Sequence, residues 1–490
     1  MKNISVQVSK HDKYQVELKF SCPIKSGKRI GDYHIELYFF MPRNLEVGSH
    51  NFDTEQFYND FYENVRFQTP HIDLESLVSD EKGILKRLRD ADPFAEDEYG
   101  KILKMFCSIA KSAMRDGESA VERENVPVAT VLSAEKYLRN TEKLLADFRI
   151  SRPQQGIAKN LELFDLVDEF LSISANSYRY KLWEFLQSVK IPVQPIIELC
   201  ADITGKELNY RKKRKYPSMP YKNSDNSELL YRESTLKKAM AGILFLNVET
   251  RRAGVFLENL LLAISAAIAM AFATAVSFIW RGLFLEEFSL SFFVVWVIAY
   301  MFKDRIKSSL QLYCMNHRNR YSYDFRQKIR DGLGNEIGIC REGFSYCNAN
   351  ELDKDITITR NRHTLSRLEN GSLEENVMVF RKRIEIYGNP CRDIFQEFAV
   401  DGIVDIMRLN VRHWTYKMDN PSRSIYTSDG KTIHRMKARR DYHVNMVLRY
   451  GERNGEDIFE RYRLVICRNG IRQLQKFPLD TAHRPEDAEK

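Results

Sequence analysis

The sequence predicts an α+β protein in which a two-helix transmembrane hairpin lies between two cytoplasmic domains. Two apolar segments lie close together between Val255 and Phe302. Before them, a short strand-rich start is followed by helical spacing of apolar side chains; after them, alternating strands are joined by tight turns. We therefore expect a mainly helical N-terminal domain with a small antiparallel sheet and a strand-rich α+β C-terminal domain.

The first apolar segment, Leu260 to Trp280, holds 21 residues without a charge. At about 1.5 Å per residue, a helix of this length crosses a hydrocarbon core of about 30 Å. The second segment, Phe288 to Phe302, has only 15 uncharged residues and reaches spanning length only if Glu286 and Glu287 are included. The alternative to a full span is that this second segment is re-entrant or lies at the membrane interface.

Lys and Arg gather before the first segment and after the second, while the loop between them carries only Arg281. Positive residues mark the cytoplasmic side, so both termini are expected in the cytoplasm of a bacterial inner-membrane protein. Small residues repeat every four positions on the first segment, which allows close approach of another helix. That helix is the second segment or a second copy of the chain, unless alanine is merely tolerated in lipid; the residues are Ala263, Ala267, Ala271 and Ala275.

The composition describes a mostly globular chain of 490 residues with a net charge of +8. This length suits three or four domains, and the mild positive charge suits an anionic membrane surface without requiring nucleic acid. The eight cysteines show no repeated spacing and are expected to be reduced thiols. The first fifteen residues contain no apolar stretch of the kind found in a cleaved signal peptide.

The N-terminal part divides into four predicted regions. Residues 1–50 alternate apolar and polar side chains and form a small antiparallel β unit, and 51–210 form a helical domain. Residues 211–227 are a basic run followed by a polar linker, and 228–254 are a juxtamembrane helix.

Basic residues flank the predicted hairpin and are candidates for contact with an anionic surface. The run at 211–215 is read as a solvated face, as a patch on anionic lipid, or as a nuclear-localisation or nucleic-acid patch. The candidates are Arg211, Lys212, Lys213, Arg214, Lys215, Lys303, Arg305 and Lys307.

The C-terminal part follows the hairpin at 255–302. A basic stalk helix is predicted at 303–332, an α+β domain with a β-meander at 335–479, and a disordered tail at 480–490.

Within the C-terminal domain, strands are predicted at 356–358 and 377–387, and a helix from Ile403 to Trp414, where apolar residues recur at helical spacing. The dipeptides Asp429-Gly430, Asn454-Gly455 and Asn469-Gly470 separate alternating segments and predict tight hairpin turns.

Two stretches, YFFMPRNL at 38–45 and FYNDFYENVRFQTP at 57–70, resemble uncharacterised bacterial membrane-associated proteins of unknown function. The resemblance covers the N-terminal fifth of the chain. It implies a bacterial inner membrane and carries no activity, cofactor or site residue.

No residue pattern marks a catalytic or cofactor site, and no phosphate loop, nucleophile elbow or HExxH motif occurs. Cys314, His317, Cys340 and Cys347 are too loosely spaced for structural zinc, so no metal is expected. His434 and His443 lie near Asp441 and suit a metal or acid–base role, although surface polar residues are the simpler interpretation. Asp401 and Asp405 are read as a solvated helix face.

The sequence combines two large soluble parts with a small membrane anchor, and it contains no recognisable set of catalytic residues. It therefore predicts a membrane-tethered scaffold or interaction protein. Its expected partners are the lipid bilayer, a second copy through the first apolar helix and an unknown protein. The alternatives are a membrane-associated enzyme near His434 and His443, or a module that binds anionic lipid or nucleic acid, with nucleic acid the less favoured ligand.

Overall fold

The computed structural model describes residues 4–23, 30–79, 83–124, 127–189, 194–253, 255–284, 290–319, 323–332, 334–348, 351–360, 375–388, 400, 402–453 and 455–478. It divides into two compact units. The sheet unit comprises Met1–Val65, Asn247–Pro390 and Val404–Lys490, and the helical unit comprises Arg66–Leu246 and Cys391–Ile403. The mixture of helix and sheet agrees with the expected α+β composition.

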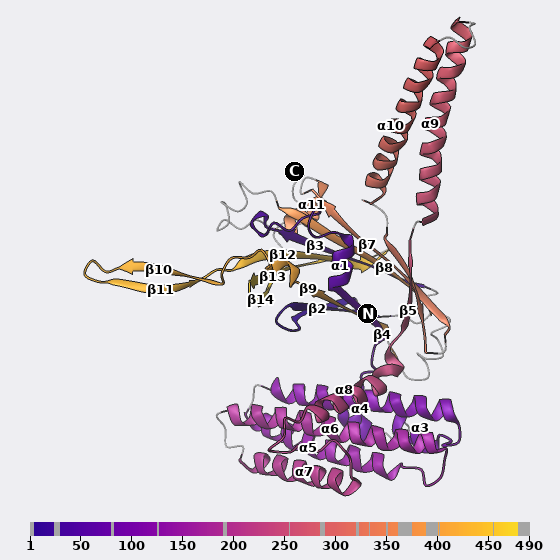
Figure 1. Ribbon diagram of the computed structural model, residues 1–490. Helices are drawn as coiled ribbons and strands as arrows, with labels where there is room; N and C mark the ends of the chain where they lie inside the picture. Colours follow the sequence, from indigo (N-terminus) through magenta and orange to yellow (C-terminus); the bar gives the residue numbers. More distant parts are fainter. Residues whose placement is uncertain are drawn as a thin grey trace, which may run out of the picture. The chain divides into compact units, whose positions relative to one another are not determined.

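The described part of the helical unit is built mainly of helices between Leu74 and Leu244. Its core is aromatic: Phe148 stacks on Phe106 at 5.2 Å between ring centroids and on Phe164 at 4.4 Å. The three rings belong to α4, α5 and α6, which lie together in the helical unit in Figure 1. The helices are α2 Leu74–Ser79, α3 Ile84–Asp90, α4 Glu96–Glu122, α5 Pro127–Ile150, α6 Ala158–Ser188, α7 Gln194–Arg214, α8 Ser227–Ala241 and η2 Gly242–Leu244.

The sheet unit contains an eight-stranded sheet in the order β14-β13-β12-β3-β8-β7-β6-β5 and a four-stranded sheet in the order β1-β2-β9-β4. The large sheet comprises β3 Ile30–Met41, β5 Asn247–Arg252, β6 Phe325–Arg330, β7 Glu336–Cys347, β8 Asn376–Tyr387, β12 Tyr442–Glu452, β13 Ile458–Cys467 and β14 Gly470–Phe477. The small sheet comprises β1 Ser5–Lys10, β2 Gln15–Pro23, β4 Phe61–Phe67 and β9 Gly402–Asn410. Short helices complete the unit: η1 Arg43–Leu45, α1 Thr54–Asp60, α11 Lys354–Arg360 and η5 His413–Thr415.

The N-terminal strands do not form a separate β unit at 1–50. Strand β3 pairs with β8 on one side and with β12 on the other, both antiparallel, so that Leu37 lies opposite Phe380 and Leu448. Strands β1 and β2 likewise join β9 and β4. The first residues of the chain therefore lie inside sheets built largely from its last third.

Three local predictions are wrong. The segment expected to be a helix from Ile403 to Trp414 is strand β9 followed by η5, because alternate residues such as Ile403 and Met407 point into the core. The predicted strand at 356–358 is part of α11, in which Ile356 is fully buried. The stalk helix ends by Asn319, and β6 occupies part of its predicted range.

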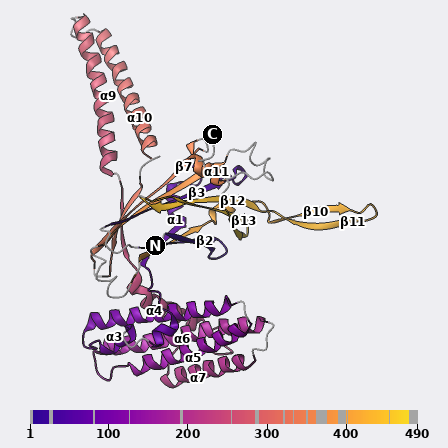
Figure 2. The same cartoon turned by 180° about the vertical axis from the view of Figure 1, so that it is seen from behind.

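The hairpins predicted at Asp429-Gly430 and Asn469-Gly470 are confirmed, and β12 pairs with β13, although Asn454 of the third predicted turn lies outside the described residues. Strands β10 Ser422–Ser428 and β11 Ile433–Arg439 pair around Gly430, and β13 and β14 pair around Gly470. Both glycines have positive φ, as these turns require. Strands β12, β13 and β14 form the predicted meander, while β10 and β11 form a separate two-stranded ribbon (Figure 2).

Between β5 and β6 the chain forms two long helices, α9 Val255–Phe284 and α10 Leu290–Asn319, which lie side by side in both views (Figures 1 and 2). Among the described residues only α9 is long and apolar enough to cross a membrane, over Asn259–Ile279. In α10 the apolar stretch Leu290–Phe302 ends at Lys303. Thirteen residues span only about 20 Å, against a hydrocarbon core of about 30 Å, so the predicted transmembrane hairpin of two helices is wrong.

Candidate functional site

A buried ionic cluster lies between the large sheet and the small four-stranded sheet of the sheet unit. Lys382 on β8 and Asp405 on β9 are both completely buried, and Lys382 Nζ lies 2.8 Å from Asp405 Oδ2. Glu342 on β7 and Glu63 on β4 each place an oxygen near the same nitrogen, at 3.1 and 3.2 Å. One ammonium is therefore surrounded by three carboxyl groups from three other strands.

The strand periodicity explains how the cluster forms. Glu342 lies directly opposite Lys382 in the antiparallel β7–β8 pair, so their side chains share one face of the large sheet. Gln327 on β6 extends this row, because its Nε2 donates to Glu342 Oε2 at 3.0 Å. Cys340, two residues before Glu342, donates its Sγ hydrogen to Glu342 Oε1 at 3.2 Å.

An aromatic layer covers one side of the cluster. Phe344, Phe380 and Phe61 lie two residues from Glu342, Lys382 and Glu63, so they project from the same strand faces. The rings of Phe61 and Phe380 are 4.6 Å apart between centroids. The ionic groups are thus enclosed by apolar side chains, where water cannot screen their charges.

The three carboxyl groups of the cluster differ in the direction in which their pKa values are shifted. Burial and the neighbouring carboxylates raise the pKa of Glu63 well above its ordinary value, and burial raises the pKa of Asp405. The pKa of Glu342 is lowered: burial opposes ionisation there, but the Lys382 charge and several hydrogen bonds outweigh it. Burial opposes the charge of Lys382 too, yet Asp405, Glu63 and Glu342 raise its pKa well above the ordinary range.

Sequence reasoning missed this cluster. Asp405 was expected on a solvated helix face beside Asp401; in the structure it is a fully buried strand residue, while Asp401 lies outside the described residues. Ile403, Asp405, Met407 and Leu409 are alternate residues, and this alternation is typical of a strand with one buried face. The charged residue Asp405 among them made the segment resemble an amphipathic helix instead.

The alanine row of α9 faces away from α10. Ser265 and Ala269 are the buried residues of α9 that lie toward α10, and they are 2% and 1% exposed. The four predicted packing residues lie on another face and are exposed: Ala263, Ala267, Ala271 and Ala275. Of the two partners considered for this row, α10 is not the one it contacts.

The predicted basic contacts differ in accessibility. Arg211 is buried and donates from Nη1 to Ser218 O at 3.0 Å, so it packs inside the helical unit. Arg214 forms an ion pair with Asp165 at 2.6 Å. Lys303 lies with its Nζ 3.6 Å from the centre of the Tyr300 ring. The remaining candidates, Lys212, Lys213, Lys215, Arg305 and Lys307, are exposed.

The two histidines considered for catalysis lie on separate strands. His434 on β11 is exposed and contacts Thr432 Oγ1 at 2.9 Å, beside the β10–β11 turn. His443 on β12 is exposed as well. Cys340 and Cys347 are seven residues apart on β7 and so face opposite sides of the sheet, whereas the side chains of Cys314 and His317 lie outside the described residues. Within the described ranges no group of three or more His, Cys, Asp or Glu side chains is placed to hold a metal.

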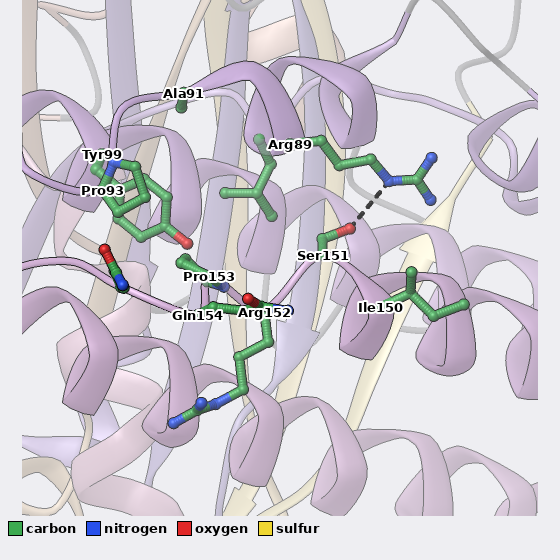
Figure 3. Close-up of a pocket in the computed structure, with 11 residues that line it drawn as sticks. Arg89, Ala91, Pro93, Tyr99, Ile150, Ser151, Arg152, Pro153 and Gln154 are labelled. Carbon is green, nitrogen blue, oxygen red and sulfur yellow. Dashed lines mark hydrogen bonds between the residues drawn. The ribbon is translucent and has the colours of Figure 1, made fainter.

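A surface cavity of about 330 Å³ lies in the helical unit where the loop after α3 meets the loop between α5 and α6 (Figure 3). Arg89 Nε donates across it to Ser151 Oγ at 3.1 Å. Arg152 is paired with Asp165, and the remaining lining residues include prolines and glutamines. The charged side chains that line the cavity, Arg89 and Arg152, bind neighbouring residues of the helical unit. We therefore interpret the cavity as a gap in the packing between the two loops.

The β10–β11 ribbon exposes nearly all of its side chains. On one face Tyr426 lies opposite Arg435, and Lys437 and Arg439 continue that face along β11. The other face places Ile425 opposite Met436. The ribbon is therefore basic on one face and partly apolar on the other.

Comparison with known proteins found no matching family model, no matching curated protein and no matching solved structure.

Proposed function

We propose that the protein is attached to a membrane through α9 and works there as a scaffold or interaction protein. The observation that supports this is the exposure of an apolar helix. From Asn259 to Ile279 the side chains of α9 are largely uncovered, including Ile264, Ile268 and Phe272 on one face. A contiguous apolar surface of this length is unfavourable in water and is stabilised by lipid. The bacterial inner membrane is the membrane we propose.

The strands on either side of α9 and α10 limit how α9 can enter the bilayer, because both strands belong to the large sheet. Strand β5 precedes α9, β6 follows α10, and the two strands are antiparallel neighbours. Because α10 is too short in its apolar part to return the chain across the bilayer, we propose that α9 embeds in the near side of the bilayer and does not carry the chain to the far side.

Flotation with lipid vesicles tests the attachment. The full chain is synthesised without cells in the presence of phosphatidylcholine vesicles and centrifuged in a density gradient. We expect the protein to float, and we expect the triple variant Ile264→Lys, Ile268→Lys and Phe272→Lys to remain in the dense fraction. Replacing Ile425 and Ile433, two exposed apolar residues of the ribbon, by Lys should leave flotation unchanged. A wild-type chain that stays dense overturns the proposal.

The scaffold role includes self-association through the exposed alanine row of α9. Small residues at four-residue spacing allow two helices to approach closely in lipid, where packing rather than the hydrophobic effect drives association. Crosslinking in membranes should give a dimer that Ala267→Leu and Ala271→Leu abolish together. Crosslinking that persists in this variant refutes the role of that face.

The basic face of the β10–β11 ribbon favours a second function, binding to anionic lipid headgroups. Arg435, Lys437 and Arg439 share one exposed face, which suits attraction to a negatively charged surface. With the triple α9 variant as background, vesicles containing phosphatidylserine should bind the chain at low salt, and changing these three residues to Gln should remove the binding. Equal binding to neutral vesicles, or a preference for an oligonucleotide over anionic vesicles, contradicts this function.

A further inference from the structure

The contact between Lys382 and Asp405 brings a primary amine and a carboxyl group together in a buried site. Nζ and Oδ2 are 2.8 Å apart, and both side chains are fully buried. Because Cγ is bonded to Oδ2, the same contact holds the nitrogen near the carbon that it would attack, as a near-attack arrangement requires.

The charges of the cluster balance when only one carboxyl group is ionised. Glu342, whose pKa is lowered, is the carboxylate that pairs with the Lys382 ammonium. Burial shifts the pKa of Glu63 and that of Asp405 upward, and the proposed reaction begins from the state in which both groups are protonated. In this state Asp405 is a neutral carboxylic acid, which is a better electrophile than a carboxylate.

We propose that the folded chain joins Lys382 Nζ to Asp405 Cγ in an isopeptide bond, with Glu342 and Glu63 as the proton-transferring groups. The product is an amide that links β8 of the large sheet covalently to β9 of the small sheet. No other cofactor or co-reactant takes part.

The reaction balances as a condensation. Lys382 transfers a proton from Nζ to Glu342, 3.1 Å away, and the neutral amine attacks Asp405 Cγ to form the new C–N bond. Protonated Glu63, which approaches the same nitrogen at 3.2 Å, supplies a proton to the departing hydroxyl group of Asp405. The C–O bond breaks and water leaves. The second proton lost from nitrogen restores the protonated form of Glu63, and the first proton stays on Glu342, so that both glutamic acids end protonated beside a neutral amide.

The dry surroundings favour each step. Proton transfer from the Lys382 ammonium to the Glu342 carboxylate converts an ion pair into two neutral groups, which a low-dielectric interior assists. The fold holds the Lys382 amine next to the Asp405 carboxyl group, so the two groups do not have to meet by diffusion. Well-oriented intramolecular reactions of this kind have effective molarities of up to about 10⁵–10⁸ M. The aromatic layer around Phe61 and Phe380 excludes the water that would reverse the reaction.

Mass spectrometry of the denatured full chain tests the proposal. We expect a mass about 18 Da below the value calculated from the sequence, which is the mass of the released water. Protease digestion should yield one branched peptide that contains both Lys382 and Asp405. This peptide separates the isopeptide bond from dehydration elsewhere in the chain. A wild-type protein with the full calculated mass, or with the mass deficit but without the branched peptide, overturns the proposal.

Two lysine variants provide a matched comparison. Lys382→Met should show the full calculated mass, whereas Lys328→Met should retain the deficit. Lys328 forms an ion pair of similar length with Glu336, 2.7 Å, but that pair is about one-third exposed. A deficit that persists in Lys382→Met contradicts the assignment.

Because Lys382→Met can also disturb folding, Asp405→Asn serves as a second probe. It keeps the side-chain shape and an attackable carbonyl, so its condensation should release ammonia and leave a deficit of about 17 Da. Glu342→Gln, which cannot accept the amine proton, should show no deficit while retaining wild-type circular dichroism. A folded Glu342→Gln protein with the complete deficit refutes the role of Glu342.

Discussion

Arg252 on β5 and Phe325 on β6 are paired neighbours in the large sheet, although α9 and α10 lie between them in the chain. The pairing continues past the strand ends, because Ala253 N donates to Asp324 O at 2.8 Å. The chain therefore leaves and re-enters the sheet at one place.

Engineered cysteines can test this pairing. Arg251 and Arg326 lie directly opposite each other, so Arg251→Cys with Arg326→Cys should form a disulfide under mild oxidation. Fragments produced by cleavage between the two positions should stay linked until they are reduced. The pair Arg252→Cys and Arg326→Cys is offset by one residue, places the thiols on opposite faces and should not link. Equal linkage in both pairs contradicts the register.

Arg211 should stabilise the helical unit more than its basic neighbours do. Arg211→Ala removes a buried guanidinium and leaves the Ser218 carbonyl without its donor, which should cost about 2 kcal/mol of unfolding free energy. The exposed Lys212→Ala should change it by less than about 0.5 kcal/mol. Denaturant unfolding of the two variants measures the difference. Equal effects would show that Arg211 is solvated.

Glu207 should make the helical unit sensitive to acid. Burial alone would raise its pKa, but the hydrogen bonds and charge of Arg149 lower it below the ordinary value of 4.5. A carboxyl group with a lowered pKa stabilises the fold above its unfolded pKa and loses this contribution as pH falls through the folded value. Stability should therefore decline from about pH 4.5 downward.

The variant Glu207→Gln should lose about 3 kcal/mol at pH 7 and show a flatter decline in acid, because Arg149 loses a buried partner. The exposed Asp202, which pairs with Lys206, supplies the control: Asp202→Asn should keep the wild-type pH profile. Thermal unfolding across pH 3–7 measures both. A Glu207→Gln profile parallel to that of the wild type would assign the acid sensitivity to other groups.

Gly470 should tolerate substitution far less well than Gly430. Both have positive φ, but a Cβ at Gly470 would also clash with the Lys13 carbonyl oxygen, while nothing lies within 4 Å of one at Gly430. Gly470→Ala should cost about 3 kcal/mol or more through strain and displacement of β1–β2 from β14, and Gly430→Ala about 1 kcal/mol. Comparable unfolding midpoints for the two variants would contradict the close approach at Lys13.

Local patterns predicted those elements whose partners are near in the chain. The turns at Gly430 and Gly470 require positive φ and join strands that follow one another, so a few residues specify each hairpin. The long helices of the helical unit show their apolar spacing within a single segment. The uncharged stretch of α9 is likewise a property of the residues themselves, and among the described residues α9 is the helix that is long and apolar enough to cross a membrane.

Long-range pairing determined the rest. By itself the sequence determined the local hairpins, the long helices of the helical unit and the apolar stretch of α9, because backbone preference and side-chain periodicity act over a few residues. Only the tertiary structure placed β3 between β8 and β12 and brought Glu63, Glu342, Lys382 and Asp405 together. A carboxylate looks solvated in a sequence unless its counter-ion is known, and here the counter-ion comes from a strand of the opposite sheet. Burial of these charges depends on contacts between strands distant in the chain, which no local pattern records.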